Sequence, residues 1–181
     1  MVKVLESHVS PRFDEASCED LLVVDERHDG VAFIAVVDGA TDKSGMRWGD
    51  KTGGRLAAET IDAAIRAFPA NIDPFAAVKE LTYSVAKLRE TLGVPEDSTT
   101  PPTASVAIYS AARRELWRVG DCHMAVRADV PIHIAPGEKG IDVAAGLARA
   151  AYTAALLSQG VPVEDIARDD PGREFIRPIL E

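Results

Sequence analysis

Three acidic residues flank two apolar runs near the start of the chain. Glu19 and Asp20 precede a short run at residues 21–25, and Asp38 follows a longer run, Val31–Val37. Hard divalent cations prefer carboxylate oxygens as ligands, and converging carboxylates repel one another unless water or a cation neutralises them. The pattern therefore predicts a divalent-cation site if the three side chains meet. The alternative is a solvated strand end, because acidic residues are common in turns.

A predicted β-hairpin would bring these carboxylates together. The Asp-Gly pair at residues 29–30 lies between the two runs and is a strong hairpin signal. Hairpin geometry places the start of the first strand beside the end of the second, so Glu19 and Asp20 should lie close to Asp38. The Val31–Val37 run is uninterrupted and rich in β-branched residues, which predicts a strand buried on both faces.

Asp38-Gly39, at the end of this predicted strand, has two interpretations. A carboxylate at that point is held rigidly at the edge of the sheet, and glycine lets the backbone approach a ligand closely. Aspartate and glycine are also among the commonest turn formers, so a plain turn is the alternative.

The rest of the chain predicts two helices, a β-meander and further helices. Apolar residues recur at helical spacing over 56–68 and again over 75–92, where Asp73-Pro74 begins the second helix. The meander consists of three β-like runs: Thr103–Tyr109, Glu115–Val119 and Cys122–Arg127. Helical patterns return at Ile141–Ser158, capped by Gly160, and at Asp170-Pro171. Runs of strands followed by runs of helices indicate the α+β class, with two antiparallel sheets and helices outside them, in a single domain over residues 1–181.

The overall composition narrows the classes of function. The chain has 181 residues, of which 20 are basic and 29 acidic, so its net charge is −9. Since it has no concentrated basic patch, nucleic-acid binding is not expected. No apolar run approaches the ~20 residues that span a bilayer, and the N-terminus lacks a signal-peptide pattern. With only two isolated cysteines, we expect a cytoplasmic protein without disulfides that does not contact a membrane.

Four short motifs, in this order, resemble those of the metal-dependent protein phosphatase 2C family. They are Cys18-Glu19-Asp20, Val36-Val37-Asp38-Gly39-Ala40-Thr41-Asp42, Thr103-Ala104-Ser105-Val106-Ala107 and Trp117-Arg118-Val119-Gly120-Asp121. Two predicted helices separate the second motif from the third. The resemblance covers about residues 17–127. It implies an αββα sandwich of antiparallel sheets flanked by helices, with the C-terminal part of the family's domain missing.

The resemblance also implies a function and a set of roles. The family removes phosphate from phosphoserine or phosphothreonine in phosphoproteins, using water activated by two Mn²⁺ or Mg²⁺ ions. By position, Asp38 would bridge both metals, while the Gly39 carbonyl and the Glu19 side chain would help to hold one of them. Asp20 would orient metal-bound water, so Asp20 and Asp38 are the expected catalytic residues. Asp121 would be structural, in a Gly-Asp turn.

Several positions depart from the family pattern. Glu15 stands where the family has its phosphate-binding arginine, so Arg12, Lys43 or Arg47 could contact phosphate instead. The family's two further metal-binding aspartates occur in Asp-Gly and Asp-Asn motifs, and no aspartate after Asp121 is followed by Gly or Asn. The chain could therefore be a non-catalytic phosphatase-like domain that binds a partner or a metal without turnover. A third alternative is an unrelated structural α+β domain.

Overall fold

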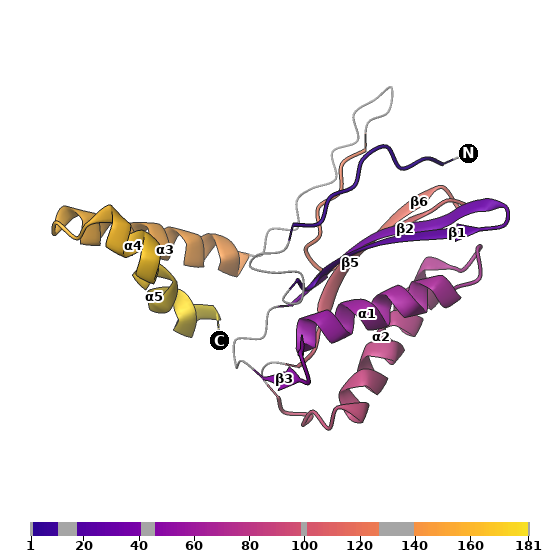
Figure 1. Cartoon of the computed structure of the whole chain (residues 1–181), viewed down its shortest axis with the longest axis horizontal. Coiled ribbons are helices and arrows are strands. Elements are labelled where there is room, and N and C mark those ends of the chain that lie inside the picture. The colour runs from indigo at the N-terminus through magenta and orange to yellow at the C-terminus, as the bar shows by residue number, and fades with distance from the viewer. Residues whose placement is uncertain (1, 11–17, 41–45, 99–100, 127–139, 181) are drawn as a thin grey trace. The chain divides into compact units, whose positions relative to one another are not determined.

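A computed structural model describes residues 2–10, 18–40, 46–98, 101–126 and 140–180 of the chain. The fold is mixed α+β, and the described residues form five helices and a four-stranded antiparallel sheet (Figure 1). The chain divides into two compact units, Met1–Pro136 and Gly137–Glu181. All of the strands belong to the first unit, together with two of the helices.

The sheet is built on the predicted hairpin. Strands β1 (Asp20–Arg27) and β2 (Gly30–Gly39) pair antiparallel, and Gly30 at the turn has a positive φ of 114°, which favours glycine. Strands β5 (Ala104–Ser110) and β6 (Glu115–Val119) extend the sheet in the order β1-β2-β5-β6. The hairpin and the first two strands of the predicted meander are thus confirmed.

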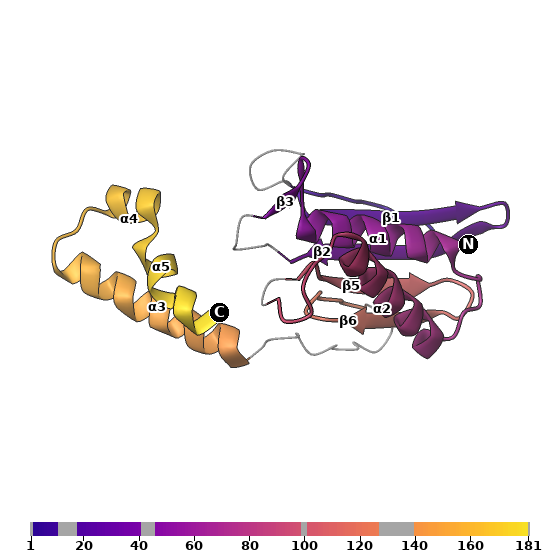
Figure 2. The same ribbon diagram turned by 90° about the horizontal axis from the view of Figure 1, so that it is seen from below.

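Two helices pack on one face of this sheet. Helix α1 (Gly53–Ala67) is capped by the Thr52 hydroxyl, and α2 (Pro74–Thr91) is capped by the Asp73 carboxylate, as predicted for the second helix. Figure 2 shows both helices lying across the sheet. The core between them contains apolar side chains of both layers: Val23, Phe33, Ala35, Val37, Ile61, Ile65, Phe68, Leu81, Val106 and Ile108.

The opposite face of the sheet contradicts one prediction. Phe33 and Val37 of β2 are buried in the core, but Val36, which points to the other face, is 45% exposed. Strand β2 is therefore not buried on both faces. The uninterrupted apolar run predicted a covering layer on each side, and α1 and α2 cover only one.

The prediction of a third meander strand, Cys122–Arg127, is also wrong. Residues 121–126 form no strand, apart from a single bridge residue at Val126, and Arg127 lies outside the described residues. A second, very small ladder pairs β3 (Arg47–Trp48) with β4 (Lys51–Thr52), directly before α1.

The described residues of the second unit, 140–180, form three helices: α3 (Gly140–Ser158), α4 (Val163–Asp169) and α5 (Pro171–Leu180). Helices α3 and α5 pack through stacked rings of Tyr152 and Phe175, whose centroids are 4.3 Å apart. Arg149 pairs with Asp170 at 2.8 Å. Gly160, with φ of 84°, ends α3 as predicted. Among the described helices, α3 is long and apolar enough to cross a membrane, a weak indication because helices of soluble proteins meet the same criterion.

Candidate acidic site

The hairpin register brings the predicted acidic residues to one end of the sheet. Asp20, the first residue of β1, pairs directly with Asp38 of β2, and Asp38 pairs in turn with Ser105 of β5. Directly paired residues point to the same face of a sheet. Asp20, Asp38 and Ser105 therefore form a polar row across the ends of three neighbouring strands, with Glu19 immediately before β1. The predicted approach of Asp20 to Asp38 is confirmed, and the charge of Glu19, next to Asp20, also acts on Asp38.

Asp38 has the most perturbed acidity in this row. Its pKa is raised from 3.8 to about 6, first by partial burial of the carboxyl group and then by the negative charge of Asp20. A hydrogen bond between the two carboxyl groups acts in the same direction, as do the charges of Asp121 and Glu19. The repulsion expected between converging carboxylates is thus present at Asp38.

Asp121 is a member of this acidic site that the sequence interpretation assigned only to a turn. Its carboxylate accepts a hydrogen bond from the Ser105 hydroxyl, and its backbone N–H lies 3.3 Å from the same oxygen. Gly120 before it has φ of 89°, and any Cβ there would collide with the Ser105 side chain. The tight turn after β6 therefore aims Asp121 at the row that contains Asp38.

Glu19 has a structural partner as well as a charge. Its carboxylate accepts a hydrogen bond from the hydroxyl of Thr52, the residue that caps α1. The backbone carbonyl of Cys18 accepts a hydrogen bond of 3.1 Å from Arg55, one turn into the same helix. Glu19 therefore ties the start of β1 to the start of α1, and its charge reaches Asp38 from the side.

Gly39 is required by packing in this fold. A Cβ at Gly39 would overlap the backbone carbonyl of Gly54, and a Cβ at Gly54 would lie 2.8 Å from the Glu19 carboxylate. The two glycines allow the first turn of α1 to pack against the end of β2. A close approach to a ligand is one interpretation of Gly39 from the sequence; in the fold, the group that approaches Gly39 is the first turn of α1.

An open cleft of about 460 Å³ lies on the face of the sheet that bears Asp20, Asp38 and Asp121. Besides these acids it is lined by polar residues of the N-terminal segment and of the turn after β6: His8, Ser10, Cys122 and His123. Burial and the charges of Asp38 and Asp121 raise the pKa of the Cys122 thiol. The thiol therefore stays protonated at neutral pH and is not an activated nucleophile.

The predicted phosphate contacts do not gather at this cleft. Arg47 of β3 donates a hydrogen bond to the backbone carbonyl of Asp50 and does not line the cleft. Arg12 and Lys43 lie outside the described residues. No arginine or lysine in the described parts of the chain lines it; the histidines among its described lining residues are His8 and His123.

The acids differ in how free they are to hold a cation. Glu19 and Asp121 are engaged by Thr52 and Ser105, while Asp20 and Asp38 face each other. Within the described ranges, no group of three or more His, Cys, Asp or Glu residues is arranged to hold a metal ion. Mg²⁺ in proteins usually keeps several waters and takes only one or two carboxylates, so the facing pair is a sufficient donor set for that type of binding.

Comparison of the chain with protein-family models, with curated proteins and with solved structures found no match. A function therefore has to be argued from the acidic site itself. Its central property is a pair of facing carboxylates, open to a cleft, at the end of two paired strands.

Proposed function

We propose that the first unit is a phosphatase-2C-like domain that binds Mn²⁺ or Mg²⁺ at Asp20 and Asp38 and hydrolyses phosphoserine or phosphothreonine in proteins. The single observation that carries this proposal is the direct pairing of Asp20 with Asp38, a carboxyl group whose pKa is raised to about 6, first by burial and then by the charge of Asp20. A divalent cation would relieve this repulsion. The choice of the phosphatase 2C family rests on the motif resemblance, and the negative charges of the facing carboxylates support a cation at that position.

The donor set suits a hard cation. Asp20, Asp38 and the backbone carbonyl of Gly39 offer oxygen ligands, which Mg²⁺ and Mn²⁺ prefer, and the charges of Glu19 and Asp121 would stabilise a cation nearby. Cys122, the sulfur ligand among the described residues that line the cleft, holds its proton because its pKa is raised. These properties disfavour soft metals, which bind thiolates.

The cations would polarise the phosphoryl group and activate water for its hydrolysis. The chain's own contribution is positional. Asp20 and Asp38 are fixed by the β1–β2 ladder, and Glu19 is fixed by Thr52 at the start of α1. With a pKa near 6, the Asp38 carboxyl is partly protonated just below neutral pH, so cation binding would release that proton.

The observed layers are compatible with an αββα sandwich. The four-stranded sheet with α1 and α2 corresponds to one half of such a sandwich, and the opposite face of that sheet carries apolar residues such as Val36, which is exposed. A second sheet would bury that face. This comparison supports the architecture that the resemblance implies.

A second candidate is a phosphatase-like domain that binds a cation or a partner without turnover. The observation that favours it is the described lining of the cleft, in which neither Arg nor Lys is available to hold a phosphate group. The two candidates agree on the cation and differ on hydrolysis.

Hydrolysis of p-nitrophenyl phosphate with Mn²⁺ tests the proposal. We expect activity that requires the cation and falls at least about 100-fold in Asp38→Ala, because a ligand is lost. Asp29→Ala is the matched control, since Asp29 also precedes a glycine but lies at the other end of the hairpin. No Mn²⁺-dependent turnover, with Mn²⁺ still bound in calorimetry, would reject the enzyme in favour of the binding domain.

A further inference from the structure

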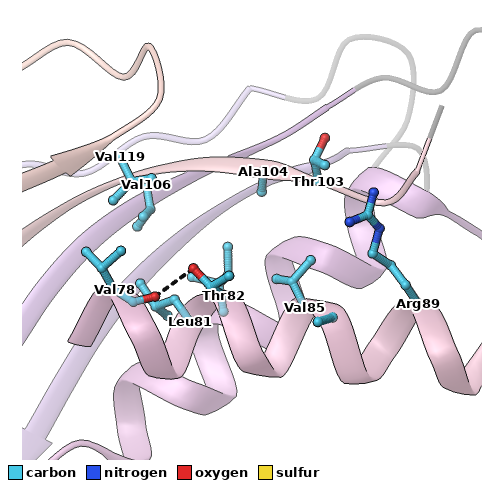
Figure 3. A pocket seen from close by; sticks show the side chains of 11 residues that line it. Val78, Leu81, Thr82, Val85, Arg89, Thr103, Ala104, Val106 and Val119 are labelled. Atoms are coloured by element: carbon cyan, nitrogen blue, oxygen red, sulfur yellow. Dashed lines mark hydrogen bonds between the residues drawn. The ribbon is translucent and has the colours of Figure 1, made fainter. Parts of the chain in front are cut away.

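A small apolar pocket lies between α2 and strands β5 and β6 of the sheet, within the first unit. Its volume is about 250 Å³, and Figure 3 shows the side chains that line it. Val78, Leu81 and Val85 come from successive turns of α2, and Val106 and Val119 come from β5 and β6. The pocket is separate from the acidic cleft, since the two share no lining residue.

The wall of the pocket offers few polar groups to a ligand. The Thr82 hydroxyl donates a hydrogen bond of 2.8 Å to the Val78 carbonyl within α2, so its polar requirement is met by the helix (Figure 3). The valines and leucine contribute only hydrocarbon surface. An occupant of the middle of the pocket must therefore be apolar.

One end of the pocket is different, because it carries a positive charge. Arg89, in the last turn of α2, lies at this end together with Thr103, as Figure 3 shows. Within the described part of the chain, none of the hydrogen bonds or ion pairs found involves the guanidinium of Arg89. Lys87, two residues earlier, lines a different groove between α1 and α2. An arginine at a helix C-terminus can serve the helix dipole alone, but that role does not need an apolar pocket beside it.

We propose that this pocket binds an aliphatic monocarboxylate, with its hydrocarbon chain between α2 and β5–β6 and its carboxylate on Arg89. The length follows from the volume: a cavity of about 150 Å³ takes up benzene, so about 250 Å³ suits roughly ten non-hydrogen atoms. Octanoate has that size. The charge follows from Arg89, because arginine can bind a carboxylate through two parallel hydrogen bonds, and the chain's net charge of −9 would repel an anion that lacked such a partner.

Calorimetric titration with octanoate tests the proposal. A ligand of this size with ordinary efficiency per atom should bind with a Kd of roughly 0.1–1 mM. Arg89→Gln should weaken binding by about tenfold or more, since a charge-assisted hydrogen bond is lost. Octanol, which has the same chain without the carboxylate, should bind wild type as weakly as octanoate binds Arg89→Gln. Lys87→Gln, the matched control on the same helix, should leave the Kd unchanged.

Two further measurements locate the ligand. Octanoate should shift the methyl NMR signals of Val85 and Val106, and Thr82→Phe should abolish binding by filling the pocket, with an unchanged circular dichroism spectrum. The proposal is overturned if octanoate does not bind, if Arg89→Gln and Lys87→Gln weaken binding equally, or if the Thr82→Phe variant still binds octanoate. Shifts of the same methyl groups with protein concentration alone would overturn it in favour of a second copy of the chain as the occupant.

Discussion

Replacing Asp38 by Asn should stabilise the cation-free protein at pH 8 and have little effect at pH 4. The folded state raises the pKa of Asp38 from 3.8 to about 6, so folding disfavours the ionised carboxylate. The stability that this group contributes is fully present below pH 3.8, where its carboxyl group is protonated in both the folded and the unfolded protein. That stability is lost as the pH rises through 6. Above that pH the charge opposes folding, and asparagine removes it.

The size of the effect follows from the same shift. A rise from 3.8 to about 6 corresponds to at most about 3 kcal/mol of unfolding free energy. The Asp38 carboxyl group is only partly buried, so solvent screening reduces this to about 1 kcal/mol. In a domain of this size, about 1 kcal/mol corresponds to roughly 3 °C in Tm.

Urea unfolding at pH 4, 6 and 8 in the presence of EDTA measures this effect. It can be followed by the fluorescence of the two tryptophans, of which Trp117 packs against the core. Asp29→Asn controls for the removal of an acid from the hairpin. A gain for Asp38→Asn that is equal at all three pH values, or a loss at pH 8, would show that folding does not raise the pKa of Asp38.

Three further predictions concern the elements that hold the site. Gly39→Ala should destabilise by about 2 kcal/mol in urea unfolding, because the new Cβ meets the Gly54 backbone; an unchanged midpoint would rule out this close packing. Thr52→Ala should cost about 1 kcal/mol by removing the α1 cap, and Thr52→Ser should recover most of that loss. Arg27→Met should cost about 2 kcal/mol because it leaves the buried Asp25 without its 2.7 Å ion pair, and Arg27→Met with Asp25→Leu should regain stability if the unpaired charge is the cause.

The parts of the fold that local chemistry dictates were predictable. The Asp-Gly turn at residues 29–30 predicted the hairpin and brought Asp20 near Asp38. The exact pairing was not predictable from the turn, because an irregularity between Asp25 and Glu26 shifts the register by one residue and places Asp20 opposite Asp38 instead of Val37. Asp73-Pro74 specified the start of α2 because an acidic cap followed by proline satisfies the first backbone groups of a helix.

The parts that depend on distant elements were harder to predict. The apolar run in β2 could not show that Val36 faces outward, because the sequence of a strand does not reveal what covers it. Asp121 was assigned to a turn because a Gly-Asp pair is a common turn. Its place in the acidic site depends on how β5 pairs with β6. Val106 pairs with Val119, and this pairing brings Ser105 beside Gly120.

Calorimetric titration of the full chain with Mn²⁺ at pH 7 tests whether Asp20 and Asp38 form a divalent-cation site. We expect Mn²⁺ to bind with release of a fraction of a proton, seen as a heat that varies with the buffer. Binding should be lost in Asp38→Ala and kept in Asp29→Ala. Equal Mn²⁺ binding by wild type and Asp38→Ala, or no binding by wild type, would contradict a cation site at these two residues.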